Sequence, residues 1–224
     1  MIKIQALLTK RADLTLAQFD SHWHSPHGDP LTLAMARIKH LVQNSRLAEA
    51  DDIATASYDG IPQVWFDTLE DAIGLQSDPA YAAADDDQVH FMDRTKLKFL
   101  MLGERAIDGD VGPGDGHGVN LLLLVRRRQG ATQEQFDSEW IGADDRGWGQ
   151  ALGATRHVTS RSLPESYAEE EPAYDGLREL FFSDLASLRA ARERAPEAWE
   201  GLTHPPAADP GQSVIYVATQ RRMR

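Results

Sequence analysis

The chain of 224 residues contains no cysteine. That absence excludes disulfide bonds, thiolate nucleophiles, and the cysteine ligands of structural zinc sites and iron–sulfur clusters. Long apolar runs are also missing, because the longest, Leu121 to Val125, is far too short to span a bilayer. Met1 leads directly into a strand pattern without the basic start and apolar core of a signal peptide, so we expect a soluble, cytoplasmic protein.

Positive charge is scarce relative to negative charge. Lys and Arg number 23 and Asp and Glu number 35, which gives a formal net charge of −12. An acidic chain repels phosphate groups, so we expect neither a nucleic-acid partner nor a membrane partner. The basic cluster Arg126 to Arg128 falls at a strand end, and the acidic runs are Asp85 to Asp87 and Glu169 to Glu171. All three are expected to be solvated charge.

What the chain does contain is an internal repeat. Residues 15–23 (TLAQFDSHW) and 132–140 (TQEQFDSEW) are identical at six of nine positions, with an offset of 117. Tyr58-Asp59-Gly60 recurs as Tyr174-Asp175-Gly176. Between the copies, residues 108–118 are too rich in Gly and Pro for a helix or a central strand, which predicts a linker. We therefore expect an N-terminal half at 1–107, a linker at 108–118 and a C-terminal half at 119–224.

Each half has the pattern of a ferredoxin-like βαββαβ unit. Ile2, Ile4 and Ala6 alternate with polar residues, which predicts a half-buried first strand. Thr15 stands three residues before Gln18, and Thr132 three before Gln135, which is the capping-box pattern of a helix start. The remaining elements expected in the first half are strands at 40–47, 61–66 and 96–103, a helix at 69–76 and a short helix after Pro79.

A βαββαβ sheet carries its helices on one face and leaves the other face bare. Two such sheets can bury their bare faces against each other, and the linker makes that packing intramolecular. The fold class expected is therefore α+β, with two ferredoxin-like repeats whose antiparallel sheets pack into one unit. An exposed edge strand in each half could still pair between chains, so a monomer and a homodimer of the duplicated unit both remain open.

Several motifs of the first half resemble the EthD-domain family. They are His27-Gly28 followed by Pro30-Leu31, Val42-Gln43-Asn44, Tyr58-Asp59-Gly60 with Val64-Trp65-Phe66, Asp78-Pro79-Ala80-Tyr81, and Phe91-Met92-Asp93. The resemblance covers nearly the whole first half and part of the second. The sequence departs from the family pattern at Asp29, inserted before Pro30, at Ser45, where the family often has histidine, and at His40, where it often has tyrosine.

The resemblance implies membership of the dimeric α/β-barrel superfamily. Relatives there include cofactor-free cyclases, isomerases, dehydratases and monooxygenases that act on hydrophobic cyclic substrates, and other relatives that bind haem. The expected arrangement is thus an intramolecular unit of the dimeric α/β-barrel type.

Histidines are concentrated in the first half of the chain. That half carries His22, His24, His27, His40 and His90, whereas the second half has Asp144 at the position that matches His27. Such an unequal distribution of histidines is expected if, after duplication, one copy kept the active site and the other was free to lose it. We therefore expect one active site in the N-terminal half and a degenerate site in the C-terminal half.

His27 is the leading catalytic candidate, because an imidazole can shuttle a proton near neutral pH. Because His27 follows a helix, its side chain could be held at the mouth of the barrel. A structural histidine in a loop that hydrogen-bonds to backbone would show the same sequence pattern. His40 is the second catalytic candidate, since with period two it shares a strand face with Asn44. His157 stands at the matching position of the second half. A histidine in both copies favours a structural role for His40 at the barrel end, with an ordinary hydrogen-bond partner, over a catalytic role.

Other residues are expected to bind substrate or to form ordinary core. The substrate-binding candidates are Trp23, Asn44, Tyr58, Trp65, Phe66, His90, Phe91 and Met101. Which strand face lines a cavity is undecided at this point. His24 and His27 have metal-ligand spacing, but Pro26 biases Ser25 away from helical geometry, so no metal is expected.

Together these features predict a cofactor-independent lyase or isomerase. Its substrate would be a hydrophobic aromatic or cyclic small molecule, as in aromatic catabolism, and His27 would move the proton with help from His40. Two alternatives stay open. One is a haem- or oxygen-dependent oxidoreductase, with His40 or His90 as the haem ligand, and the other is a non-catalytic binding protein for small molecules.

Overall fold

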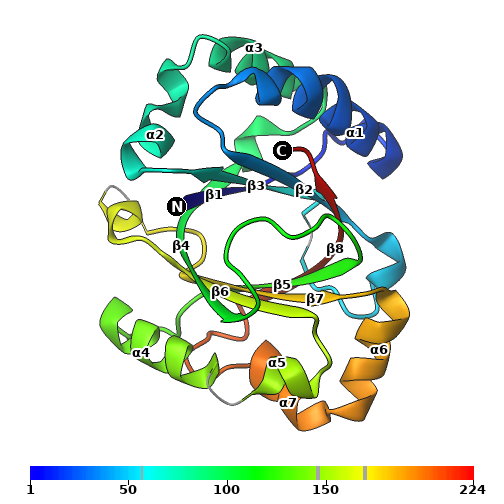
Figure 1. Ribbon diagram of the computed structural model, residues 1–224, viewed down its shortest axis with the longest axis vertical. Helices are drawn as coiled ribbons and strands as arrows, with labels where there is room; N and C mark the ends of the chain where they lie inside the picture. The colour runs from blue at the N-terminus through cyan, green and yellow to red at the C-terminus, as the bar shows by residue number, and fades with distance from the viewer. Residues whose placement is uncertain (57, 145–146, 169–170) are drawn as a thin grey trace.

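The computed structural model describes residues 1–56, 58–144, 147–168 and 171–224, without the side chains of Ala143 and Asp144. These residues form a mixed α/β fold built on a closed barrel of eight antiparallel strands (Figure 1). The strands are β1 (Ile2–Leu7), β2 (His40–Arg46), β3 (Gly60–Phe66), β4 (Lys98–Asp108), β5 (Val119–Val125), β6 (Arg156–Ser162), β7 (Gly176–Phe182) and β8 (Val214–Arg222).

The order of the strands around the barrel is β1-β3-β2-β8-β5-β7-β6-β4. Read within each half, the order is β4-β1-β3-β2 and β8-β5-β7-β6, so the fourth, first, third and second strands are neighbours in both. The halves join where β2 pairs with β8 and β4 pairs with β6. The expectation of an exposed edge strand in each half is therefore wrong, because closure pairs both edges of both sheets.

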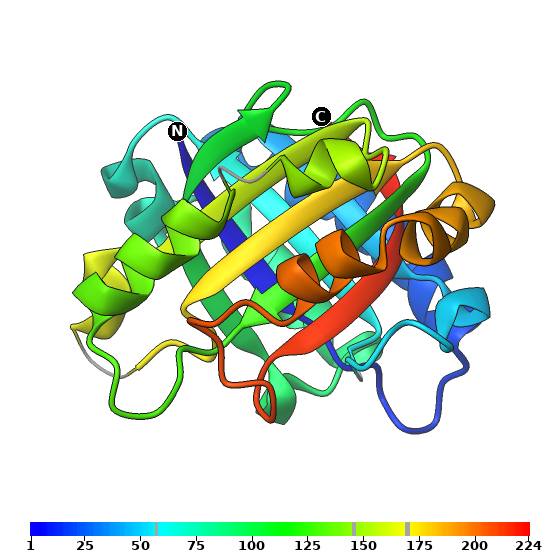
Figure 2. The same ribbon diagram turned by 90° about the horizontal axis from the view of Figure 1, so that it is seen from below.

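Helices cover the outer faces of the barrel. The α-helices are α1 (Leu16–His22), α2 (Leu69–Ile73), α3 (Tyr81–Asp87), α4 (Gln133–Asp144), α5 (Trp148–Ala151), α6 (Leu185–Arg194) and α7 (Pro196–Thr203). Other helical turns lie at Trp23–Leu31, Thr32–Ala34, Ala48–Ala50, Gly74–Ser77, Gln88–His90, Arg94–Lys96 and Pro164–Tyr167. Figure 1 shows α1 to α3 over the first sheet, and Figure 2 shows α4 to α7 across the second.

The predicted capping boxes are present. Gln18 N donates to Thr15 Oγ1, and Thr15 N donates to Gln18 Oε1. Gln135 N donates to Thr132 Oγ1, and Thr132 N donates to Gln135 Oε1, in the second half. The same hydroxyl and amide groups thus begin the first helix of each half, as the sequence pattern predicts.

The fourth strand is longer than expected and includes the first residue of the expected linker. β4 extends to Asp108, rather than ending near Gly103, because its later residues pair with β6. The segment after β4 then crosses one end of the barrel before it enters β5 (Figure 1). There Gly112 N donates a 3.0 Å hydrogen bond to Glu104 Oε2, so the segment is attached to the barrel it crosses.

The inside of the barrel is strongly polar at one end. Lys3 Nζ lies 2.9 Å from Glu104 Oε1 and 2.5 Å from Glu179 Oε2. Gln63 Nε2 donates to Gln5 Oε1 and to Glu179 Oε1. The prediction of a half-buried first strand is therefore wrong: its polar face points into the barrel, where charges contributed by both halves pair with each other. Toward the other end the interior is apolar, with Leu7, Leu100 and Leu122 among its members.

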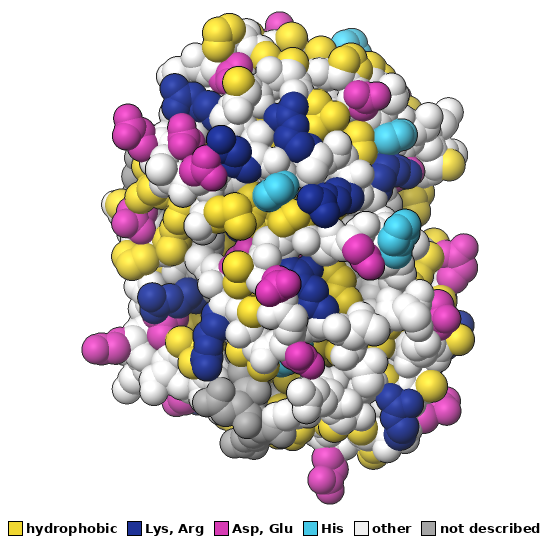
Figure 3. Space-filling view, viewed as in Figure 1, with side chains coloured by type: hydrophobic (Ala, Val, Ile, Leu, Met, Phe, Trp, Pro, Cys, Tyr) yellow, Lys and Arg dark blue, Asp and Glu magenta, His cyan; other side chains and the backbone are white. Residues whose placement is uncertain are grey.

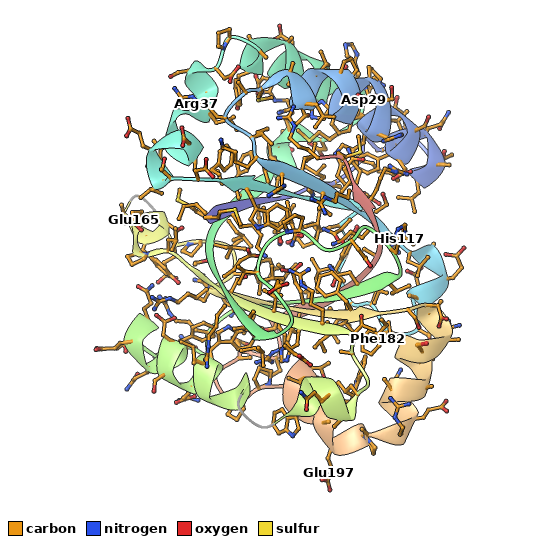
Figure 4. The ribbon with its side chains drawn as sticks, in the orientation of Figure 1. Asp29, Arg37, His117, Glu165, Phe182 and Glu197 are labelled. Atoms are coloured by element: carbon orange, nitrogen blue, oxygen red, sulfur yellow. The ribbon has the colours of Figure 1, made fainter. Side chains whose placement is uncertain are left out.

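The outer face of each sheet packs against its helices. Ile4, Val64 and Phe66 belong to the core between the first sheet and its helices, while Leu121, Leu180 and Phe182 belong to the core of the second. Figure 4 shows side chains filling both layers and the barrel between them. None of the described helices is long and apolar enough to cross a membrane.

Candidate functional site

A cavity of about 120 Å³ lies between the outer face of the first sheet and its helices. Its wall is mostly apolar. The lining residues are Ile4, Ala6, Leu8, Trp23, His27, Thr32, Met35, Ile38, Leu41, Gln43, Pro62, Val64, Phe66, Leu75, Tyr81, Ala84, Asp85, Gln88, Phe91, Met92, Leu97 and Phe99. The strand face left undecided by the sequence is thus the face that carries Val64 and Phe66.

His27 reaches this cavity from an irregular turn rather than from a regular helix. Within the turn Trp23–Leu31, Ser25 and Asp29 have extended backbone angles, as expected for residues that precede proline. The Thr32 hydroxyl donates a 2.9 Å hydrogen bond to the His27 carbonyl oxygen. His27 therefore lies between the helices and the outside of the sheet, and not at a barrel mouth as its sequence position suggested.

Two imidazoles share one carboxylate beside the cavity. His27 Nδ1 lies 3.1 Å from Asp87 Oδ2, and His22 Nε2 lies 3.0 and 3.1 Å from the two Asp87 oxygens. The exposed fraction is 13% for the His27 side chain, 12% for Asp87 and 28% for His22. His27 is thus the inner member of the group and His22 the outer one.

The surroundings of His27 favour its neutral form. Burial lowers the pKa of the His27 imidazole below its ordinary value, and the nearby Asp87 carboxylate only partly offsets this. The His27 ring also packs on Phe91, with ring centroids 4.7 Å apart. A carboxylate on one ring nitrogen leaves Nε2 as the nitrogen that can take a proton from a ligand.

Sequence reasoning missed Asp87 and Gln88. Asp87 belongs to the run that we expected to be solvated, yet it lies on α3 and bonds two histidines. Tyr81, Ala84 and Gln88 line the cavity with helical spacing, so one face of this segment forms its wall. Helical spacing after Pro79 was the available signal, but nothing in the sequence indicates that this face meets His27.

Four of the predicted site residues meet at the cavity: Trp23, His27, Phe66 and Phe91. The other six lie elsewhere. His40 pairs with Trp65 across β2 and β3, on the face that points into the barrel. There Trp65 Nε1 donates to Glu104 Oε2 at 2.8 Å, and Asn44 Nδ2 donates to the Ile61 carbonyl oxygen.

The last three of these six are also separate from the cavity. The Tyr58 hydroxyl lies 3.0 Å from the Tyr174 hydroxyl, beside the apolar barrel core. Met101 lies on the outer face of β4, where its carbonyl oxygen accepts from Leu163 N. His90 is exposed, with its ring 6.1 Å from that of His22. The side chain of Asp144, the counterpart of His27, lies outside the described residues.

The C-terminal end of the second half supports the walls of the site from behind. Arg224 Nη1 donates to the carbonyl oxygens of Met35 and Ile38, both of which line the cavity. Met223 packs against the same core. The residues that follow β8 therefore hold the segment that leads from His27 to β2.

Neither a metal nor a haem fits this site. In the described part of the chain, no three His, Asp or Glu side chains are arranged to hold a metal ion. His40 and His90, the haem ligands suggested by the sequence, do not line the cavity. A cavity of about 120 Å³ is close in size to the roughly 150 Å³ cavity that holds one benzene molecule. A porphyrin is several rings across and does not fit.

The first half of the chain matches a known domain family. Residues 11–95 match the EthD domain family. The match confirms the resemblance seen in the motifs of the first half, and its range includes His27, Asp87 and Gln88. No curated protein matches the sequence.

Several solved structures have a similar fold. An anthrone oxidase-like protein is 13% identical with a TM-score of 0.65, over 99% of this chain and 92% of that one. A protein of Fusobacterium nucleatum with the provisional name of monooxygenase is 8% identical with a TM-score of 0.58, over 100% and 92%. A mutant chlorite dismutase from Candidatus Nitrospira defluvii is 10% identical with a TM-score of 0.51, over 97% and 90%. At these identities the likeness shows the fold alone.

Proposed function

We propose that the protein is a cofactor-independent lyase or isomerase in which His27, oriented by Asp87, moves a proton on a small apolar cyclic or aromatic substrate. One observation carries the proposal. An imidazole paired with a carboxylate at 3.1 Å lines an apolar cavity of about 120 Å³. Elimination, hydration and ring isomerisation all begin with proton transfer of this kind.

Asp87 supports a base at His27 in two ways. It accepts from Nδ1–H, which fixes the tautomer whose Nε2 carries the lone pair, and it stabilises the imidazolium that forms when Nε2 takes a proton. Because burial lowers the pKa of His27, the imidazole is neutral at pH 7 and ready to accept a proton. The same nitrogen then returns the proton to another substrate atom, which completes an isomerisation or an elimination.

The cavity supplies orientation and exclusion of water. Its volume of about 120 Å³ suits a single ring, because a cavity of roughly 150 Å³ holds benzene. Trp23 and Phe91 on its wall offer flat apolar faces to such a ring. In a dry site the attraction between Asp87 and the imidazolium is stronger than in water, which favours the proton-transferred state.

The names of two fold relatives favour a second candidate. An anthrone oxidase-like protein and a protein with the provisional name of monooxygenase share the architecture. In this alternative, His27 deprotonates a ring CH2 group of the same kind of substrate, and molecular oxygen oxidises the resulting anion: one oxygen atom enters the product as a carbonyl and the other leaves as water. Measuring oxygen uptake during turnover separates the two: uptake equal to the substrate consumed supports oxidation, and none supports a lyase or isomerase.

We also propose that the two halves, 1–107 and 119–224 with 108–118 between them, arose by tandem duplication. The shared strand order supports this. So do equivalent hydrogen bonds: Lys10 N donates to Asp59 Oδ2, and Arg127 N donates to Asp175 Oδ2. Because the second half takes the place of a partner subunit, the chain acts as a monomer. Sedimentation equilibrium tests this, since a mass of two chains would indicate a homodimer.

Replacing His27 tests the proposed chemistry. Hydrogen–deuterium exchange into a panel of small cyclic ketones and phenols, followed by NMR in D2O, detects proton transfer without knowledge of the natural substrate. We expect His27→Gln to slow the exchange by about 10²–10⁴-fold, the usual contribution of a placed base. His90→Gln is the matched control, because His90 is exposed and outside the cavity. Unchanged exchange in His27→Gln contradicts the proposal.

A further inference from the structure

Apart from His27 and the indole of Trp23, five polar side chains line the cavity: Thr32, Gln43, Tyr81, Asp85 and Gln88. Three of these are bonded to the protein. The Thr32 hydroxyl donates to the His27 carbonyl oxygen, and Asp85 is 3.0 Å from Arg94 Nη2. Gln43 donates to the Trp23 carbonyl oxygen and accepts from Arg221. These three groups are therefore already committed to holding the wall together.

Gln88 differs from them. Its Oε1 is buried and has no hydrogen-bond partner among the described residues. A buried carbonyl oxygen without a donor costs free energy, and native proteins normally satisfy such a group with protein or with a bound molecule. Gln88 is one of the residues that line the cavity, so a turn of its amide would bring Oε1 to a molecule bound there, and that molecule would supply the missing donor.

We propose that Gln88 determines specificity by accepting a hydrogen bond from the hydroxyl group of a neutral, single-ring substrate. This inference rests on the proposed function in one respect, that the cavity beside His27 is the substrate site. It adds the chemical class of the substrate, a phenol or a cyclic enol. The ring lies among the apolar side chains, and its hydroxyl is directed to Gln88 Oε1.

The charge of the lining excludes an anionic substrate. The wall includes the carboxylate of Asp85 but no Lys or Arg side chain. Burying an ionised ligand without an opposite charge is strongly unfavourable. A carboxylate-bearing aromatic compound is therefore rejected, while a phenol, which is neutral at pH 7, enters without this penalty.

Binding of three small compounds tests the inference. The three compounds are similar in size and differ in one substituent. Phenol carries a hydroxyl that can donate a hydrogen bond, toluene carries an apolar methyl group, and benzoate carries a charged carboxylate. Isothermal titration calorimetry of the full chain with each gives the affinity. We expect phenol to bind about tenfold more tightly than toluene, as one good hydrogen bond gives, and benzoate to show no measurable binding.

The variant Gln88→Met keeps the side-chain length and removes the acceptor. We expect it to abolish the preference for phenol and to leave toluene affinity within about twofold. Gln76→Met, at an exposed position outside the cavity, is the matched control and should keep the preference. Circular dichroism verifies that each variant is folded. Equal affinity for phenol and toluene in the unchanged protein, or a preference that survives Gln88→Met, overturns the inference.

The variant His27→Gln separates this inference from the proposed function. If Gln88 recognises the hydroxyl, phenol stays preferred over toluene in His27→Gln, whatever happens to proton exchange. Lost exchange with a retained preference supports both statements. Retained exchange with a retained preference supports the role of Gln88 and contradicts that of His27.

Discussion

In each half of the barrel, a tryptophan packs against the glycine that begins a strand. Trp23 packs against Gly60 of β3, and Trp140 packs against Gly176 of β7. A Cβ added to Gly60 would come 2.7 Å from Trp23 Cζ3, and one added to Gly176 would come 3.0 Å from Trp140 Cε2. Any other residue would push the indole away from the sheet. Beyond this shared contact the halves differ, because Trp23 faces a cavity whereas Trp140 is surrounded by further side chains.

The difference can be traced to specific positions. Pro62 lines the cavity in the first half, and Arg178 occupies the corresponding position on β7. The Arg178 guanidinium lies 4.1 Å from the ring centroid of Trp140, and its Nη1 donates to the Leu202 carbonyl oxygen on α7. Where the first half leaves a cavity, the described part of the second half has a packed core, as expected if one sheet serves the proposed binding site and the other serves stability.

The largest effect is expected from breaking the ionic group that joins the halves inside the barrel. Lys3→Met leaves Glu104 and Glu179 buried beside each other without their cation. We expect a loss of about 3–5 kcal/mol in the free energy of unfolding, measured by urea denaturation.

The control for this change removes the charges together. Lys3→Met combined with Glu104→Gln and Glu179→Gln should regain most of the lost stability, because no unpaired charge remains. If the single variant is as stable as the unchanged protein, the ionic group does not hold the halves together.

The two tryptophans give effects of similar size and the most direct contrast between the halves. Trp140→Ala removes packing on all sides together with the Nε1 hydrogen bond to the Ser160 carbonyl oxygen, so we expect a loss near 5 kcal/mol. Trp23→Ala should cost nearer to about 3 kcal/mol, because one side of Trp23 faces the cavity and makes fewer contacts there. Thermal and urea unfolding of both variants measure the difference, and equal losses would contradict the contrast.

His157 makes the second half sensitive to acid. Burial, and to a lesser extent the positive charge of Arg178, lowers the pKa of His157 to about 3. The unfolded chain binds a proton near pH 6.5 and the folded chain does not, so stability is complete above that pH and declines as pH falls toward 3.

The expected slope is about 1.4 kcal/mol per pH unit in this window. His157→Gln removes this contribution, so its free energy of unfolding should fall less steeply than that of the unchanged protein between pH 6 and pH 4. Parallel curves would show that His157 is protonated in the folded state.

The smallest effect concerns the carboxylate beside the cavity. Because Asp87 raises the pKa of His27, Asp87→Asn should lower that pKa further below its ordinary value of about 6.5. NMR titration of the histidine rings measures the change. Asp86→Asn, at the exposed neighbouring position, is the control and should leave the His27 titration unaltered. An unchanged titration in Asp87→Asn would mean that the carboxylate does not orient His27.

Much of the fold follows from local sequence patterns. The second and third strands were predicted at 40–47 and 61–66 and lie at His40–Arg46 and Gly60–Phe66. The capping boxes were predicted because hydroxyl and amide stand at fixed spacing. The packing of the two sheets was expected from the bare face that each must bury, and a barrel-type unit from the family resemblance, but the pairing of every edge was not expected.

The features that could not be predicted from the sequence depend on contacts between residues far apart in the chain. Lys3 was expected on an exposed face, but its partner Glu179 lies 176 residues away and draws it into the barrel. Asp87 was read as solvated charge for the same reason, since His27 lies 60 residues earlier. Periodicity cannot choose between two strand faces when each carries apolar side chains, which is why Trp65 and Phe66 were both candidates although only Phe66 lines the cavity.

The surface carries charges of both signs. On the face seen in Figure 3, Lys and Arg side chains alternate with Asp and Glu and form no continuous basic patch. Several charged side chains of the described residues are paired with each other, such as Arg128 with Glu139 and Arg126 with Glu171. The basic cluster Arg126 to Arg128, expected to be solvated, is thus largely occupied by local ion pairs.

A crystal structure of the protein under xenon pressure tests the central contrast most directly, because xenon enters dry apolar cavities. We expect one xenon site in the first half, between Trp23 and Phe91, that phenol displaces. We expect no xenon between β7 and α7 in the second half, where Arg178 bonds to the Leu202 carbonyl oxygen. Xenon in the second half, or none beside His27, would contradict the division of the barrel into a binding half and a packed half.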